Sequence, residues 1–118
     1  MDARAAVGEY GERVAARHLV AQGMRVLARG WRCRSGEIDI VALDGACLVV
    51  CEVKTRRSVA AGTALEAVGP VKLRRLRRLT AAWLAERGEA FDDVRIDVVG
   101  VTLPARGAPV VEHLRAVG

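Results

Sequence analysis

The sequence has no hydrophobic segment close to the length that crosses a bilayer. Its 118 residues are 52% hydrophobic, but no uninterrupted apolar run approaches the roughly 20 residues that a membrane-spanning helix needs. The first residues, Met1 to Arg4, lack the basic start and apolar centre of a signal peptide. We therefore expect a cytoplasmic protein with no membrane partner. The length fits a single domain over residues 1–118, with room for a substantial core.

Cysteine is scarce, and histidine more so. The three cysteines are odd in number and form no Cys-x-x-Cys spacing, which argues against a disulfide framework and against a zinc site. Cys47 and Cys51 lie within an apolar strand pattern, where a free cysteine acts as a small hydrophobic residue. His18 and His113 are isolated in the sequence, and no role is predicted for either.

Lysine is nearly absent from a basic chain. The net charge is +5, and of the 19 basic residues only Lys54 and Lys72 are lysine. A positive balance favours an anionic partner such as nucleic acid. Lysine is a compact charge whose protonation can be tuned, whereas arginine stays charged. The two lysines that an arginine-rich chain retains are therefore candidate functional residues.

Acidic residues occur inside two apolar strands. Residues 36–43 and 46–54 have strand patterns, and Asp44-Gly45 between them is a strong hairpin signal. A two-residue turn there would place Asp39 opposite Val50, and side chains alternate between the faces of a strand. One predicted face carries Glu37, Asp39, Val50, Glu52 and Lys54, and the other carries Ile38, Ile40, Cys47, Val49, Cys51 and Val53.

This pattern predicts a metal-dependent phosphodiester hydrolase. Charges within apolar strands are costly unless something binds them, and neighbouring carboxylates suit Mg²⁺ or Mn²⁺ completed by water and phosphate. Asp39 and Glu52 would bind the metal, which lowers the pKa of a bound water. Lys54 would orient that water or neutralise charge on the phosphate. Glu37 would either join the metal site or hold Lys54 or an arginine.

A helix is predicted on each side of the strands. Residues 3–22 have a helical apolar face, formed by Val7, Tyr10, Gly11, Val14, Ala15, His18 and Leu19, with Gly23 as the cap. Glu12 lies at the edge of this face, where it is either an ordinary boundary residue or an acid that reaches the sheet. A second helix begins at Pro70 and ends at Gly88, with its apolar stripe formed by Leu73, Leu76, Leu79, Thr80, Trp83 and Leu84.

The first half of the second helix is crowded with cations. They are Lys72, Arg74, Arg75, Arg77 and Arg78, with no acid among them. Such a run is either a solvated face or a surface that contacts phosphates. Residues 55–69, which include Arg56 directly after the Glu-x-Lys sequence, are predicted to be a mobile loop that contacts substrate.

Further strands are predicted at residues 24–29 and 93–103, and residues 110–117 are either a last strand or a short tail. Residues 30–35 form a basic connection around Trp31, which either stacks on a base or sugar or packs against the edge of the core. Asp97 is another acid inside an apolar run, with no partner that its spacing identifies.

These motifs resemble those of the PD-(D/E)XK nuclease superfamily. Asp39, Glu52 and Lys54 match its motif, and Glu12 matches the first-helix acid of its archaeal Holliday-junction-resolvase branch. More closely, the chain resembles the YraN-like family of small bacterial proteins. The segments that carry this resemblance are residues 8–12 with Ala15 and Ala16, residues 36–42, residues 52–56, Lys72 and residues 95–99.

The resemblance implies an α/β fold with a restriction-endonuclease-like core of order αβββαβ and a mixed sheet flanked by helices. It implies a Mg²⁺- or Mn²⁺-dependent endonuclease of DNA recombination and repair, with branched or otherwise structured DNA as a candidate substrate, and it favours a homodimer. Its site residues would be Asp39, Glu52, Lys54 and Glu12. Lys72, Arg74, Arg75, Arg78 and Arg56 would contact the nucleic acid. Two other readings remain open: a DNA-processing accessory protein without useful catalysis, and an interaction module whose acids and lysine form structural ion pairs.

Overall fold

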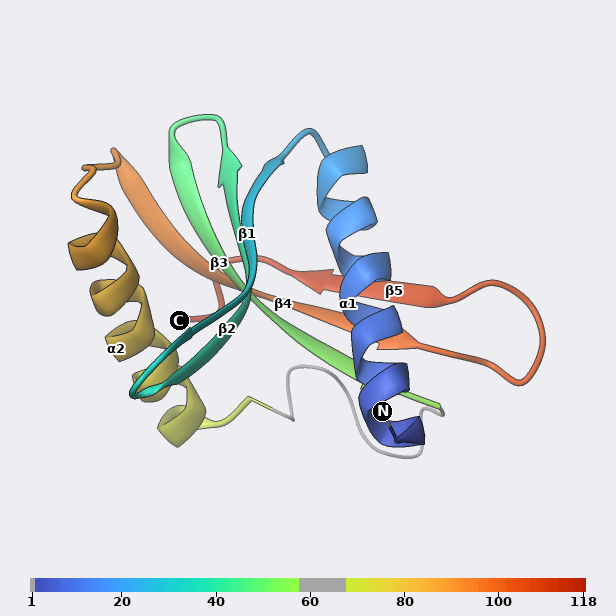
Figure 1. The fold of residues 1–118 in the computed structure, drawn as a ribbon. Coiled ribbons are helices and arrows are strands. Elements are labelled where there is room, and N and C mark those ends of the chain that lie inside the picture. Colours follow the sequence, from blue (N-terminus) through green and yellow to red (C-terminus); the bar gives the residue numbers. More distant parts are fainter. Residues whose placement is uncertain (1, 58–67) are drawn as a thin grey trace.

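The part of the chain that the structure describes forms a five-stranded mixed sheet with one helix on each face (Figure 1). The computed structural model describes residues 2–57 and 68–118. The elements are α1 (Ala3–Ala21), β1 (Arg25–Cys33), β2 (Gly36–Asp44), β3 (Cys47–Arg56), α2 (Pro70–Arg87), β4 (Asp93–Thr102) and β5 (Val110–Leu114). These five strands lie in sequence order; β3 and β4 pair in parallel, and the other three pairs among them are antiparallel. The predicted αβββαβ order is confirmed, followed by one more strand.

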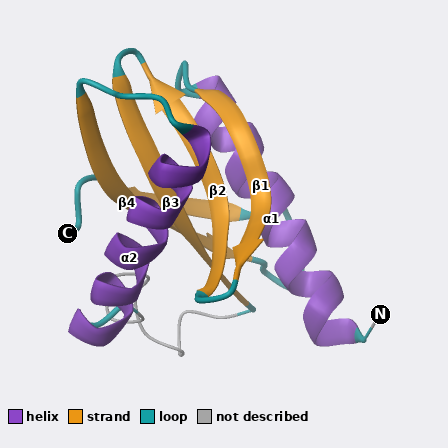
Figure 2. Cartoon of the chain, turned by 60° about the vertical axis from the view of Figure 1, so that its left-hand side comes forward, coloured by secondary structure: helices purple, strands orange, loops and turns teal. Residues whose placement is uncertain are grey.

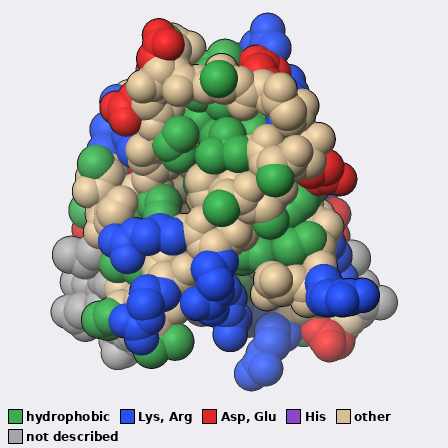
Figure 3. Space-filling model, turned by 90° about the vertical axis from the view of Figure 1, so that its left-hand side faces the viewer, with side chains coloured by type: hydrophobic (Ala, Val, Ile, Leu, Met, Phe, Trp, Pro, Cys, Tyr) green, Lys and Arg blue, Asp and Glu red, His purple; other side chains and the backbone are tan. Residues whose placement is uncertain are grey.

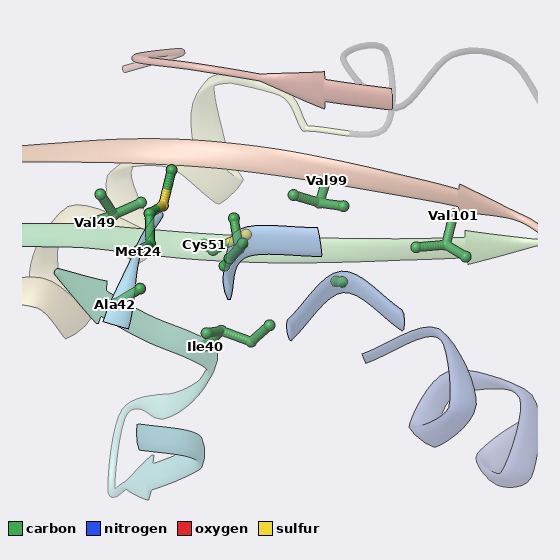
Figure 4. Close-up of a cluster of buried hydrophobic side chains, with 9 residues drawn as sticks. Met24, Ile40, Ala42, Val49, Cys51, Val99 and Val101 are labelled. Atoms are coloured by element: carbon green, nitrogen blue, oxygen red, sulfur yellow. The ribbon is translucent and has the colours of Figure 1, made fainter. Parts of the chain in front are cut away.

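Each helix covers its own apolar core. On the α1 side, Ala15 and Leu19 pack against alternate residues of β2, β3 and β4 (Figure 4). On the α2 side, Leu76, Leu79 and Trp83 pack against the other set of strand residues. Figure 2 shows the sheet between the two helices. Within the described residues, neither helix is long and apolar enough to cross a membrane.

The ends of α2 follow the predicted signals, and α1 begins at a cap that was not predicted. The side chain of Asp2 caps α1 by accepting a hydrogen bond from the Ala5 N–H at 2.8 Å. Pro70 occupies the first turn of α2, and Gly88 ends that helix with φ +67°, a left-handed conformation that glycine adopts without strain. Along α1 the buried residues are Gly11, Ala15 and Leu19, whereas Tyr10, predicted to face inward, is exposed.

The first strand is longer than predicted, because β1 continues to Cys33 through the residues expected to form a basic connection. Trp31 lies in this strand and packs against the core on the α2 side. Its indole N–H donates to the Glu86 carboxylate at 2.8 Å. Of the two readings of Trp31, the structure supports packing at the edge of the core.

The β2–β3 hairpin turns one residue later than predicted. Asp44 pairs with Cys47, so the turn is Gly45-Ala46, and Val41 rather than Asp39 lies opposite Val50. The pairs shift by two residues, which leaves the alternation of faces intact. The Asp44-Gly45 sequence still serves the turn, because Gly45 adopts φ +61°.

Pairing between β2 and β3 runs only as far as Ile40 and Cys51. Beyond that point β2 stays paired with β1 and leaves β3. Alternation breaks there: Ile40 packs on the α1 side and Ile38 on the α2 side. The prediction that these two residues share a face was therefore wrong, whereas Cys47, Val49, Cys51 and Val53 do lie with Ile40. The opening between the strands is the place where the acidic residues gather.

Candidate functional site

Three carboxylates meet where β2 separates from β3. Glu12 comes from α1, and Glu37 and Asp39 come from β2; one oxygen of each lies within 4.8 Å of the others. All three residues are half-buried. Asp39 also spans the opening, because its Oδ2 accepts a hydrogen bond from the Val53 N–H of β3 at 2.8 Å. The side chain thereby replaces a ladder hydrogen bond that the separated strands no longer form.

The environment of these acids disfavours their joint ionisation. Burial raises the pKa of Asp39 to about 7, and the charge of Glu52 raises it too, although the hydrogen bond from Val53 opposes the shift. Burial likewise raises the pKa of Glu12, against the opposing charge of Arg29. Converging carboxylates of this kind are relieved by a proton or by a cation. An all-oxygen set without cysteine or histidine suits Mg²⁺ or Mn²⁺.

Two arginines of β1 contact the outer acids. Arg29 lies 3.5 Å from Glu12, and Arg32 lies 3.3 Å from Glu37. Arg32 is largely exposed, so its pair with Glu37 is weak. Among the residues that the structure describes, Asp39 has no such ion pair. Asp39 is therefore the acid of this group that depends most on an added cation.

Glu52, which was predicted to bind the metal, forms an ion pair with a lysine. Its side chain is buried, and its Oε1 lies 2.8 Å from Nζ of Lys72 on α2. Burial of Lys72 lowers the pKa of its ammonium, but the hydrogen bond to Glu52 and the charges of Glu52 and Asp39 outweigh it, so the pKa is raised. Of the predicted metal set, Glu37 and Asp39 lie in the converging group together with Glu12, whereas Glu52 pairs with Lys72.

A cleft of about 760 Å³ opens beside the acids, between the first half of α1 and the end of β3. Glu12, Asp39 and Lys54 line it, together with Arg4, Arg56 and Arg57. Lys54 and the two acids were predicted to belong to one site, and the structure places them in one cleft. The predicted contact loop falls mainly on residues 58–67, which lie outside the described residues.

The cations in the first half of α2 form a surface of their own. The exposed members are Arg74, Arg75, Arg77 and Arg78, and Lys72 is half-buried at the edge nearest the acids. In Figure 3, which faces this side of the molecule, basic side chains gather in the lower half below an apolar area. Their shared exposure on one helix leaves them accessible to a polyanion.

A second charged network lies at the other edge of the sheet, and the sequence did not reveal it. Asp97 is fully buried and accepts hydrogen bonds from the Arg95 Nε–H at 3.0 Å, from His113 Nε2 at 2.8 Å and from the Ala116 N–H at 3.0 Å. Nδ1 of His113 lies 3.0 Å from Nε2 of His18 on α1. With Asp97 ionised, His113 donates to it and accepts from His18, so the two histidines are structural partners.

Comparison with known proteins places the chain in a family. The sequence profile of "Uncharacterised protein family UPF0102" matches residues 11–101. The chain belongs to the UPF0102 family. This is the YraN-like group that the motifs predicted, and it falls within the PD-(D/E)XK-like nuclease group.

UPF0102 relatives resemble the chain over nearly its whole length. A UPF0102 protein of Kineococcus radiotolerans is 66% identical over 98% of this chain and 95% of its own length. Another, from a Nocardioides species, is 58% identical over 96% of this chain and 91% of its own. A third, from Streptomyces griseus, is 59% identical over 99% of both chains. The names of these UPF0102 proteins state no activity.

Proposed function

We propose that this UPF0102 chain is a Mg²⁺- or Mn²⁺-dependent nuclease that hydrolyses phosphodiester bonds in DNA. The observation that carries the proposal is the convergence of Glu12, Glu37 and Asp39 at the strand opening, with Lys54 in the adjoining cleft. The family's PD-(D/E)XK motif supports it. As a DNA enzyme it would act in the cytoplasm.

The three acids fit a hard divalent cation by their chemistry. They supply oxygen only, they come from two different elements, and the pKa of Asp39 is raised to about 7, as expected of a carboxylate that lacks a counter-charge. A bound metal would polarise the scissile phosphate and acidify a water. Glu12, Glu37 and Asp39 would hold it.

The remaining site residues act on the phosphate and the water. Lys54, on the wall of the same cleft, donates hydrogen bonds to a non-bridging phosphate oxygen or to the attacking water. Lys72 neutralises Glu52, so that this buried carboxylate does not repel the substrate. Arg56 and the α2 arginines Arg74, Arg75 and Arg78 hold neighbouring phosphates, and such contacts position a strand without reading its sequence.

A second candidate is a DNA-binding accessory protein without catalysis. The observation in its favour is the 2.8 Å ion pair between Glu52 and Lys72, which engages the motif carboxylate with a protein cation. Both candidates share the basic face of α2 and a salt-dependent affinity for nucleic acid. Metal-dependent cleavage separates them.

The test uses labelled linear, single-stranded, flap and four-way-junction DNA with Mg²⁺, Mn²⁺ or EDTA. The nuclease proposal requires cleavage that EDTA stops and that Asp39→Ala and Lys54→Ala each abolish. Binding of every substrate with no cleavage supports the accessory protein. Absence of both binding and cleavage contradicts both candidates and favours the interaction module. Cleavage of RNA substrates with the same sequences and shapes shows whether the protein prefers DNA or RNA.

A further inference from the structure

Gly11 has no room for a side chain, although it lies in the middle of a helix. A Cβ built on Gly11 would overlap Oγ1 of Thr55 and would lie 2.7 Å from its Cγ2 and 2.8 Å from its Cβ. Contacts below 3.0 Å force a shift of the neighbouring atoms. The obstructing atoms are the Cβ of Thr55, in β3, and the two atoms bonded to it. Rotation about χ1 does not move the Cβ, so it cannot remove the overlap.

The same helix contains a glycine under no such constraint. Gly8 lies three residues earlier, and a Cβ built there meets nothing within 4 Å. Glycine inside a helix is disfavoured relative to alanine because it loses more backbone freedom on folding. At Gly11 that cost has a structural reason, namely the close approach of α1 to β3. Gly8 offers a matched position for comparison.

The contact between Gly11 and Thr55 lies next to a site residue on each of its two elements. Gly11 directly precedes Glu12, and Thr55 directly follows Lys54. Glu12 is the one acid of the group that α1 supplies, so its distance from Glu37 and Asp39 depends on how closely the helix approaches the sheet. An added methyl must lift the helix by several tenths of an ångström or more to reach ordinary contact distances, and Glu12 would move with it.

We propose that Gly11 is a positioning residue for the candidate metal site. The missing side chain lets α1 touch β3 at Thr55, and this contact sets Glu12 within reach of Glu37 and Asp39. The inference rests on the proposed function, because it assumes that these acids bind a divalent cation. It adds that the geometry of the site is fixed by one glycine–threonine contact outside the acids themselves.

The test is Mn²⁺ binding measured by calorimetry for the wild type, Gly11→Ala, Gly8→Ala and Glu12→Gln, without nucleic acid. Residues that orient metal ligands typically change affinity by about 10–100-fold. We expect Gly11→Ala to weaken Mn²⁺ binding about tenfold or more, as Glu12→Gln does, and Gly8→Ala to leave it unchanged. Equal affinity of Gly11→Ala and wild type overturns the positioning role, even if Gly11→Ala has a lower Tm.

A compensating variant guards against a simple folding defect. The double variant Gly11→Ala with Thr55→Gly removes the three obstructing threonine atoms and adds one methyl group. If the Gly11–Thr55 contact positions Glu12, the double variant should fold and should bind Mn²⁺ within about threefold of Thr55→Gly alone. Failure of the double variant to fold or to regain affinity overturns the inference. A wild type that binds no Mn²⁺ instead contradicts the proposed function on which the inference rests.

Discussion

Asp39 has both a structural contact and a proposed chemical role. Its carboxyl accepts the Val53 N–H where β2 leaves β3, and it lies beside Glu12, Glu37 and the charge of Glu52. Among the described residues no cation pairs with it. An ionised, half-buried carboxylate without a counter-charge lowers the free energy of unfolding of the metal-free protein. This effect is measurable as a dependence of stability on pH.

The stability of the metal-free protein should fall as pH rises from about 4 to about 7. The pKa of Asp39 is raised to about 7 in the folded state, against about 3.9 in an unfolded chain. Between these values the folded state binds the proton more tightly, so the stabilisation is present below pH 4 and is lost by pH 7. The difference between these two pKa values corresponds to roughly 4 kcal/mol. Asp39→Asn should remove this part of the pH dependence of the free energy of unfolding.

The measurement is urea unfolding in EDTA at pH 5 and pH 8. Asparagine can still accept the Val53 N–H, so the variant keeps the fold and changes only the titration. Identical pH dependence in the wild type and in Asp39→Asn would show that Asp39 does not titrate in this range. A strong loss of stability in Asp39→Asn at both pH values would instead support a structural ion pair.

Lys72 is predicted to support stability as well as chemistry. Lys72→Met keeps the apolar stem but leaves the buried Glu52 carboxylate without its partner at 2.8 Å. Because Lys72 is itself about one-third exposed, we expect a loss of about 1–3 kcal/mol in the free energy of unfolding at pH 7. Arg74→Met, at an exposed position of the same helix, should change it by less than about 0.5 kcal/mol.

Among the elements, α2 is the one that should govern binding to a polyanion. The four arginines in its first half, at positions 74, 75, 77 and 78, are all exposed. If they contact phosphates, each Arg→Ala change should weaken DNA binding equally on all sequences and reduce the slope of log affinity against log salt by about 1. Binding titrations between about 50 and 200 mM salt measure this slope.

Arg106 provides the control for that experiment. It is exposed in the connection between β4 and β5, and Figure 1 shows this connection at the opposite side of the molecule from α2. Arg106→Ala changes the net charge by the same amount as Arg75→Ala. An equal loss of affinity in the two variants would mean that net charge, and not the α2 surface, attracts DNA.

At the scale of the whole molecule, Asp97 joins the last strand and the C-terminal residues to the sheet. It is fully buried and bonds Arg95, His113 and the backbone of Ala116. Asp97→Asn should lower the free energy of unfolding by about 3–5 kcal/mol, because it breaks a buried charged network. Asp93→Asn, in the same strand but exposed, should cost less than about 1 kcal/mol in chemical denaturation. Equal effects would contradict a structural role for Asp97.

The sequence predicts the elements well because they depend on local signals. Asp2, Pro70 and Gly88 act within one turn of their helices, and the apolar stripe of α2 recurs at the helical period. The hairpin register was wrong by two residues because both possible two-residue turns contain Gly45 and both keep the same alternation of faces. Nothing local in the sequence distinguishes them.

Side-chain partners that lie far apart in the sequence, in the site and beyond it, were harder to predict because they meet only through the packing of distant elements. Glu52 meets Lys72, and His18 meets Asp97 through His113, only once α1, α2 and β5 are packed. The strand opening that brings Glu12 in place of Glu52 breaks the alternation on which the prediction relied. One local signal was present: Gly11, a glycine inside a helix directly before Glu12, marks a close approach.

Cleavage of one DNA substrate as a function of Mn²⁺ concentration tests the central claim most directly, with the wild type, Asp39→Asn and the control Asp93→Asn side by side. We expect metal-dependent cleavage by the wild type and by Asp93→Asn, and a rate at least about 100-fold lower for Asp39→Asn. Cleavage that persists in EDTA, or equal rates in the wild type and Asp39→Asn, would contradict a metal-dependent nuclease site at Asp39.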